Sequence, residues 1–197
     1  MNHCSSQTPS RAVVNKALAA CRKIKFRSAW SEDVERLNAL VVEVLPTSLT
    51  VAASYCDAVY YFVRHMGCLH ESWRTGGVDT VDLVTLAMTS HVSSARMQEL
   101  GAQALDTLQA YCHDNIRHVV SCNSPATLCE AADAHVSNVK VQIHVCAALN
   151  HVISTKEMPR DVLVRVQQVA SRAKMEHPSY AKYFESLLLS LANVYCG

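Results

Sequence analysis

The chain repeats part of its own sequence after 44 residues, and this repeat constrains the fold more than any other feature. Residues 91–98 read HVSSARMQ and residues 135–142 read HVSNVKVQ, and an Ala-Leu pair follows six residues later in both copies. A repeat interval of about 20 to 50 residues is typical of stacked units, because one such unit cannot bury its apolar side alone. We therefore expect an array of similar units that share one continuous core.

Two weaker copies extend the repeat toward both ends of the chain. One begins at His177 and ends in SLANV at 190–194, and a fainter one ends in AVYYF at 58–62. Four copies of 42 to 46 residues then fit the chain. The predicted organisation is a basic N-terminal segment, 1–28, followed by a helical repeat domain, 29–197, with units at about 29–66, 67–111, 112–155 and 156–197.

The repeated units are predicted to be helical, which makes the fold class all-α. Only five glycines and five prolines occur, too few for the frequent turns of an all-β protein. Apolar residues recur at helical spacing, as at Val139, Ile143, Cys146 and Leu149. Capping residues and prolines place helices at about 31–45, 48–65, 79–90, 93–111, 115–120, 125–134, 137–154, 159–175 and 178–195, with Asp79 as one N-cap and Pro46 ending the first.

The ends of these units resemble the armadillo repeat, whose long third helix often ends in Ala-Leu-x-Asn-Leu. Residues 190–194 follow that ending closely, and the resemblance covers about 32–197. Short second helices make HEAT repeats an equally close comparison, and no first helix is evident between 67 and 78. The resemblance implies a right-handed α-solenoid of about four armadillo/HEAT-like units, whose long helices line a concave surface for extended peptides or partner domains.

The resemblance also implies a partner-binding groove made of two columns one helix turn apart. Carried onto this chain, the groove consists of Asp57, Tyr61, Gln103, Thr107, Ala147, His151, Leu189 and Asn193. The tryptophan and asparagine ladder of nuclear import receptors is missing, so binding of nuclear localisation signals is not implied. A basic row at the start of the long helices is interpreted as a solvated rim, with a binding row for acidic peptides as the alternative: Arg96, Lys140 and Lys182.

No motif for catalysis, cofactor binding or metal binding stands out. The chain has nine cysteines and ten histidines but no Cys-x-x-Cys and no His-Glu-x-x-His. The nearest clusters are Cys68 and His70 beside His65, and Cys112-His113 with His118 and Cys122. Neither a Gly-x-Ser-x-Gly motif nor a phosphate-binding glycine loop occurs. We therefore predict no catalytic residue, no metal ligand and no cofactor.

Charge and cysteine usage bear on the compartment. All 17 acidic residues follow residue 28, whereas six basic residues precede it, from Arg11 to Arg27. This segment is interpreted as a solvated helix, with a mitochondrial presequence or an arm for acidic tails, anionic lipid or nucleic acid as alternatives. The odd cysteine count without a signal peptide indicates reduced thiols in an intracellular protein. No apolar run is long enough to span a membrane.

The predicted function is that of a non-enzymatic scaffold or adaptor, in the cytoplasm or alternatively in mitochondria. By analogy with armadillo-like proteins that lack the import ladder, cytoskeletal or ciliary assemblies are its expected setting. Leu187, Leu188 and Leu189 cannot all face the core, which suggests that the last helix docks against a protein partner. The alternatives are a small helical metal-dependent protein or enzyme that uses the His/Cys clusters, and an organelle-targeted ribonucleoprotein subunit.

Overall fold

The computed structural model describes residues 9–26, 31–66, 79–111, 113–155 and 157–196, and within them the chain is all-α, as predicted. These residues form ten α-helices and one short 3-10 helix, with no strand among them. The helices are α1 (Arg11–Phe26), α2 (Ser31–Val41), α3 (Leu49–Met66), α4 (Thr80–Ser90), α5 (Ala95–Tyr111), α6 (His113–Ser121), α7 (Ser124–Ala134), α8 (Val139–Ile153), α9 (Arg160–Glu176), η1 (Pro178–Tyr180) and α10 (Ala181–Cys196).

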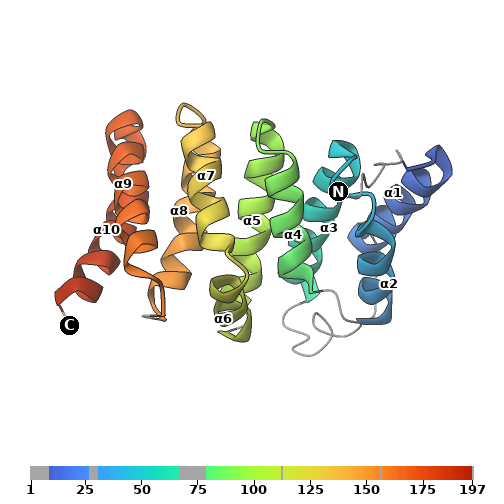
Figure 1. The fold of residues 1–197 in the computed structure, drawn as a ribbon, viewed down its shortest axis with the longest axis horizontal. Helices are drawn as coiled ribbons and strands as arrows, with labels where there is room; N and C mark the ends of the chain where they lie inside the picture. The colour runs from blue at the N-terminus through green and yellow to red at the C-terminus, as the bar shows by residue number, and fades with distance from the viewer. Residues whose placement is uncertain (1–8, 27–30, 67–78, 112, 156, 197) are drawn as a thin grey trace, which may run out of the picture.

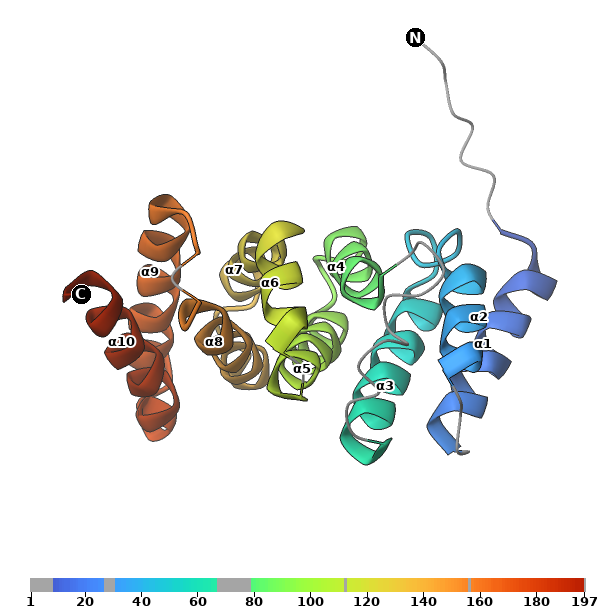
Figure 2. The same cartoon turned by 90° about the horizontal axis from the view of Figure 1, so that it is seen from below.

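The helices stack in chain order along the long axis of the molecule, with α1 and α10 at opposite ends (Figure 1). Helix α1 packs against α3, α3 against α5, α5 against α8, and α8 against α10. Figure 2 shows α3, α5, α8 and α10 along one side of the stack, while α4, α6 and α7 cover the other side. The protein is thus built from two layers of helices around one continuous core. Among the described residues, no helix is long and apolar enough to cross a membrane.

The basic N-terminal segment contributes a helix to this core. On α1, Ala17, Cys21 and Ile24 are buried, and the helix packs against α3. The predicted region without a helix, 67–78, lies outside the described residues, as does Arg27.

The predicted N-cap of α4 is confirmed, whereas the end of α2 differs from the prediction. The Asp79 carboxylate accepts a hydrogen bond of 2.7 Å from the Val81 backbone nitrogen. Helix α2 was expected to reach residue 45 but ends at Val41, and the backbone N–H groups of Val44 and Leu45 both donate to the Val41 carbonyl. Because Pro46 lacks an N–H group and disfavours helical geometry at the residue before it, the chain tightens into turns.

Three histidines at the same position of the sequence repeat contact residues 41 to 46 positions earlier in the chain. In each case the ring nitrogen Nε2 donates a hydrogen bond to a backbone carbonyl oxygen of the preceding predicted unit, because a carbonyl oxygen can only accept. The bonds run from His91 to Leu45 at 2.7 Å, from His135 to Val92 at 2.7 Å, and from His177 to Val136 at 2.8 Å. The histidine at the start of each repeat copy is therefore a contact between units.

Two equivalent glutamines close the ends of α4 and α7. Gln98 Nε2 donates to the carbonyl oxygens of Met88 at 2.9 Å and His91 at 3.0 Å. Gln142 Nε2 donates in the same way to Ala132 at 2.8 Å and His135 at 3.0 Å. The last carbonyls of a helix lack helical partners, and these buried amides add side-chain donors to them. The His91 and His135 carbonyls also accept backbone N–H bonds from the turns that follow. The shared glutamine of the repeat is thus structural.

Gly101 marks a close approach of α5 to α4. A Cβ atom at this position would lie 2.4 Å from Met88 Cγ and 2.7 Å from Met88 Sδ, both too short for real contacts. The positions 44 residues further along hold Ala132 and Val145, which are also buried. The large Met88 on α4 is therefore paired with glycine on α5. At the equivalent positions, the small Ala132 on α7 is paired with the larger Val145 on α8.

An ion-pair cluster joins α7 to α9 and gives a first testable prediction. Asp133 accepts hydrogen bonds from Arg165 at 2.9 Å and from Arg172. Partial burial alone raises the pKa of the Asp133 carboxyl, but the bonds from Arg172 and Arg165 outweigh it and hold that pKa below its ordinary value of 3.8. The Asp133 side chain is 38% exposed, so solvent screening limits the contribution of the cluster to about 0.5–1 kcal/mol.

We expect Asp133→Asn to lose this stability at neutral pH, as measured by urea denaturation. Because the folded-state pKa is lowered, the contribution is present above 3.8 and is lost as the pH falls toward the folded-state value. The wild type should therefore lose more stability than the variant between neutral pH and that range. Parallel pH profiles for the two proteins would contradict the assignment.

Candidate partner-binding groove

The predicted groove columns lie on α3, α5, α8 and α10, the helices that form one layer of the stack. Asp57, Tyr61, Gln103, Ala147 and His151 are half-buried, and Asn193 is exposed. Leu189 is 67% exposed, whereas Thr107 is only 8% exposed. The columns are therefore accessible in part, and most openly on α10.

Two of the column residues are engaged within the stack itself. The Thr107 hydroxyl donates to the Gln103 carbonyl oxygen at 2.8 Å. His151 Nε2 lies 3.2 Å from the Asp106 Oδ1 atom and so joins α8 to α5. These contacts leave Thr107 and His151 with fewer hydrogen-bonding groups for a partner. The column residues at the C-terminal end of the layer are the more accessible ones.

Two adjacent hollows lie between α8 and α10. Their volumes are about 430 and 290 Å³, and both are lined by Asn150. We call this surface the α8–α10 groove, and it is lined by Ile143, Cys146, Ala147, Asn150, Ile153 and Ser154 of α8 and its end, and by Lys182, Tyr183, Ser186, Ser190, Asn193 and Val194 of α10. The predicted residues Ala147, Asn193 and Lys182 are brought together here.

Asn150, which the columns do not include, lines both hollows. Its Oδ1 atom is buried and has no hydrogen-bond partner within the described residues. The columns assign the asparagine position of the repeat to His151, one residue further along. Asparagine in the segment ALNHV, next to the expected position, is the sequence signal that marks it. Because this oxygen makes no hydrogen bond, the Asn150 amide loses none when it turns toward a ligand in the hollow.

The three members of the predicted basic row have different surroundings. The Arg96 guanidinium lies 2.9 Å from the Glu99 Oε1 atom, and Lys140 Nζ lies 4.0 Å from the same oxygen. Glu99 thus offsets charge at the first two positions, as expected for a solvated rim. Lys182 instead lines the α8–α10 groove beside Tyr183, which is 61% exposed. Lys182 therefore adds positive charge to the α8–α10 groove.

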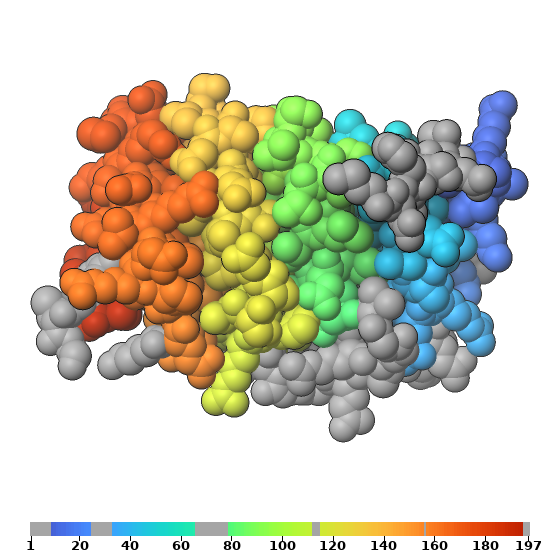
Figure 3. Space-filling view, in the orientation of Figure 1, coloured from blue at the N-terminus to red at the C-terminus, as the bar shows by residue number. Residues whose placement is uncertain are grey.

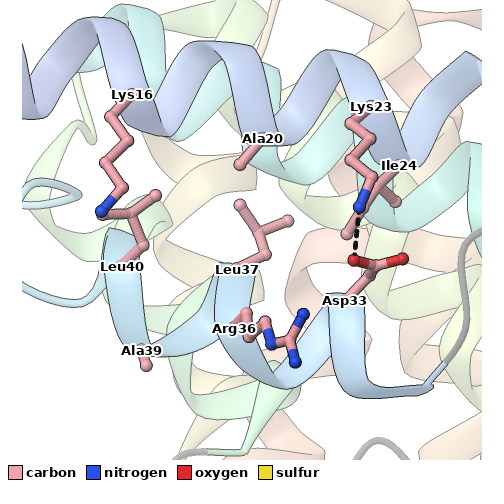
Figure 4. Close-up of a pocket in the computed structure, with 9 residues that line it drawn as sticks. All are labelled: Lys16, Ala20, Lys23, Ile24, Asp33, Arg36, Leu37, Ala39 and Leu40. Carbon is pink, nitrogen blue, oxygen red and sulfur yellow. Dashed lines mark hydrogen bonds and ion pairs between the residues drawn. The ribbon is translucent and has the colours of Figure 1, made fainter.

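A separate hollow, of about 540 Å³, lies between α1 and α2 at the other end of the stack (Figure 4). Apolar side chains including Ala20 and Leu37 line it, and Lys16, Lys23 and Arg36 add positive charge. Asp33 offsets part of this charge because its Oδ1 atom lies 2.6 Å from Lys23 Nζ. The basic N-terminal residues thus border an apolar hollow, but this hollow does not continue the predicted columns.

Some cysteines are deeply buried, whereas Cys122 lies in a cluster with a histidine. Burial raises the pKa of the Cys21, Cys129 and Cys146 thiols to about 12, so these thiols stay protonated at neutral pH. Of the two predicted His/Cys clusters, Cys68 and His70 lie outside the described residues, as do Cys112 and the side chain of His113. The structure does bring His118 and Cys122 together, beside Asp82 of α4.

No family model, curated protein or solved structure matches this chain. The armadillo and HEAT relationship stays a resemblance of sequence. The shape and chemistry of the α8–α10 groove carry the functional conclusion.

Proposed function

We propose that the chain is a non-enzymatic intracellular adaptor that holds an extended segment of a partner protein in the α8–α10 groove. The same proposal treats the two-layer stack as a short right-handed α-solenoid with armadillo/HEAT-like units, whose partner-binding face is the layer of α3, α5, α8 and α10. The observation that supports it most is the pair of hollows that follow each other between α8 and α10.

The chemistry of the groove favours a peptide as its occupant. Ile143 and Ala147 provide an apolar wall, and Asn150, Ser186 and Ser190 add polar side chains that can hydrogen-bond a peptide backbone. Lys182 adds a cation that would pair with an acidic side chain of the peptide. Apolar walls with a few placed polar groups are typical of binding sites that select both shape and chemistry.

Exposed apolar side chains beside the groove enlarge this surface. Leu189 follows Ser186 by three residues and precedes Asn193 by four, so it lies next to both on the surface of α10. Leu187 is fully buried while Leu189 is 67% exposed, which confirms that the consecutive leucines do not all face the core. An exposed leucine next to a hollow is suited to cover by a partner.

Charge and bulk placed in the groove should abolish partner binding. We expect Ser186→Arg to lower the recovery of specific partners at least about tenfold in quantitative affinity purification of the tagged full chain, because the arginine fills the hollow. Lys182→Glu should select against the same partners if they present an acidic side chain to Lys182. Circular dichroism and thermal unfolding should show that both variants stay folded, since both positions are exposed.

The matched control places the same substitution on the other layer. Ser90→Arg, at the exposed end of α4, should leave the partners unchanged. If Ser186→Arg and the wild type capture the same proteins in equal amounts, the groove is not the binding surface. If Lys16→Glu in the hollow between α1 and α2 removes the partners instead, the N-terminal end carries the function.

A further inference from the structure

Figure 3 shows the face of the molecule on which α4 and α6 lie, in green and yellow-green. The start of α4 and the end of α6, two helices in contact, contribute four potential metal ligands. Oxygen of Asp82, nitrogen of His118 and sulfur of Cys122 all lie within 4.8 Å of one another. His118 Nε2 lies 3.4 Å from Asp82 Oδ1 and 3.5 Å from Asp79 Oδ2. The group therefore combines a histidine, a cysteine and two carboxylates.

The backbone presents these side chains as two pairs. Asp79 and Asp82 are separated by three residues at the start of α4, and His118 and Cys122 are separated by four at the end of α6. The Cys122 backbone nitrogen donates to the His118 carbonyl oxygen at 3.0 Å, which continues the helical turn. Residues at such spacings share one side of a helix, so each pair faces the other.

The distances match the edges of a tetrahedral coordination shell. Bonds from zinc to nitrogen or oxygen are about 2.0–2.1 Å, so two such ligands of one tetrahedral ion lie about 3.3–3.5 Å apart. The two measured distances from His118 Nε2 to carboxylate oxygens, 3.4 and 3.5 Å, fall in this range. They are longer than the usual distance of a hydrogen bond between nitrogen and oxygen.

The His118 ring supplies an independent indication. Its Nε2 atom is buried and makes no hydrogen bond within the described residues, although carboxylates lie on two sides. A buried polar atom without a partner is uncommon and is often explained by an ion or water. A cation bound between this nitrogen and the Asp82 carboxylate would give the nitrogen a partner.

Cys122 differs from the deeply buried cysteines because hydroxyl groups surround its sulfur. Cys122 Sγ lies 2.9 Å from Ser124 Oγ, and Ser124 Oγ lies 2.7 Å from Thr85 Oγ1. The Ser124 hydroxyl can turn to donate to a thiolate, as outer ligands do around metal-bound sulfur. Asp82, whose side chain is 49% exposed, leaves a path for an ion from solvent.

We propose that Asp82, His118 and Cys122, with Asp79 beside them, form a binding site for a zinc-like divalent transition-metal ion. The ligands are His118 Nε2, the Cys122 thiolate and the Asp82 carboxylate, and the fourth position of the tetrahedron is left for a water molecule from solvent. On binding, the thiol releases its proton to solvent and its sulfur bonds to the ion. Imidazole and sulfur ligands select zinc, cobalt and related metals over magnesium and calcium, which prefer oxygen.

Such an ion would connect two units of the stack. Helix α4 lies in the second predicted unit and α6 in the third, and the two helices contact each other. The bound metal would therefore hold their relative position, which is a structural rather than a catalytic role. This site is independent of the α8–α10 groove, which lies between other helices.

Cobalt(II) provides the direct test because its absorption reports both geometry and sulfur ligation. The untagged full chain, stripped of metal by a chelator, is titrated with cobalt(II) and then with zinc(II). We expect one equivalent of cobalt, intense visible bands of a tetrahedral ion and an ultraviolet sulfur-to-cobalt charge-transfer band. Zinc should displace the cobalt and raise the melting temperature.

Variants locate the ion. Cys122→Ser should remove the charge-transfer band, and His118→Asn and Asp82→Asn should each weaken zinc binding at least about tenfold. The matched control, Cys68→Ser with His70→Asn, changes the other His/Cys cluster and should keep the cobalt spectrum. Since Asp82 is half-exposed, its variant should fold even if the others do not. The proposal is wrong if wild-type protein binds no cobalt at one equivalent, or if Cys122→Ser or Asp82→Asn binds it unchanged.

Discussion

Replacing Gly101 with valine is expected to destabilise the protein by about 3 kcal/mol, because the new side chain enters the space of Met88. The clash is severe, since even a Cβ atom would lie 2.4 Å from Met88 Cγ. Met88 is fully buried, so it has no open space into which to move. Urea denaturation followed by circular dichroism measures the loss.

The neighbouring unit suggests how to recover this stability. Its equivalent pair is Ala132 and Val145, so Met88→Ala combined with Gly101→Val copies that pair into the second unit. We expect the double variant to be more stable than Gly101→Val alone, with a coupling free energy of about 2 kcal/mol between the two positions. Valine has a higher helix propensity than glycine, so propensity cannot explain a loss at Gly101. Ala110→Val, at an exposed position of α5, shows what a β-branched residue costs in this helix without a clash. Additive effects of Met88→Ala and Gly101→Val would show that the two sites do not compete for space.

Replacing Gln142 with leucine is expected to cost about 1–2 kcal/mol, even though leucine has a similar volume and is more apolar. The substitution removes the side-chain donor of the Ala132 carbonyl oxygen, whereas the His135 carbonyl keeps its bond from the Asn138 backbone nitrogen. A buried polar group that loses its partner costs about 1–3 kcal/mol. Thermal and urea unfolding should both report the loss.

An exposed glutamine gives the matched control for this prediction. Gln168→Leu on α9 should change the free energy of unfolding by less than about 0.5 kcal/mol. Gln98→Leu, the equivalent change one unit earlier, should resemble Gln142→Leu because Gln98 makes the same pair of bonds. A Gln142→Leu protein as stable as the wild type would mean that the repeated glutamine is not a helix-end donor.

The sequence predicted the helices well because their signals are local. Apolar spacing, the Asp79 cap and the prolines each act within a few residues, so most boundaries lie close to those observed. The hydrogen bonds of the repeated histidine and glutamine could not be predicted from such local signals. His91 reaches Leu45, which is 46 residues earlier, and only the packing of units shows that contact.

The candidate groove was predicted in part. Ala147, Asn193 and Lys182 lie in it, since a shared column places residues on one side of the stack. The sequence could not show that Thr107 is buried or that Asn150 lines both hollows, because each depends on how closely neighbouring helices pack. The sequence placed His118 and Cys122 in one cluster, but it could not show that the Asp82 carboxylate of another helix lies beside them.

The most direct test of the adaptor proposal is site-specific photo-crosslinking in cells. A photoreactive amino acid is placed at Ser186 in the α8–α10 groove or, as control, at the exposed Glu130 of α7 on the other layer. The proposal predicts that Ser186 forms a discrete crosslink to a partner protein, and that unlabelled wild-type chain but not the Ser186→Arg variant competes it away. A discrete crosslink from Glu130 with none from Ser186 would contradict the assignment of the groove.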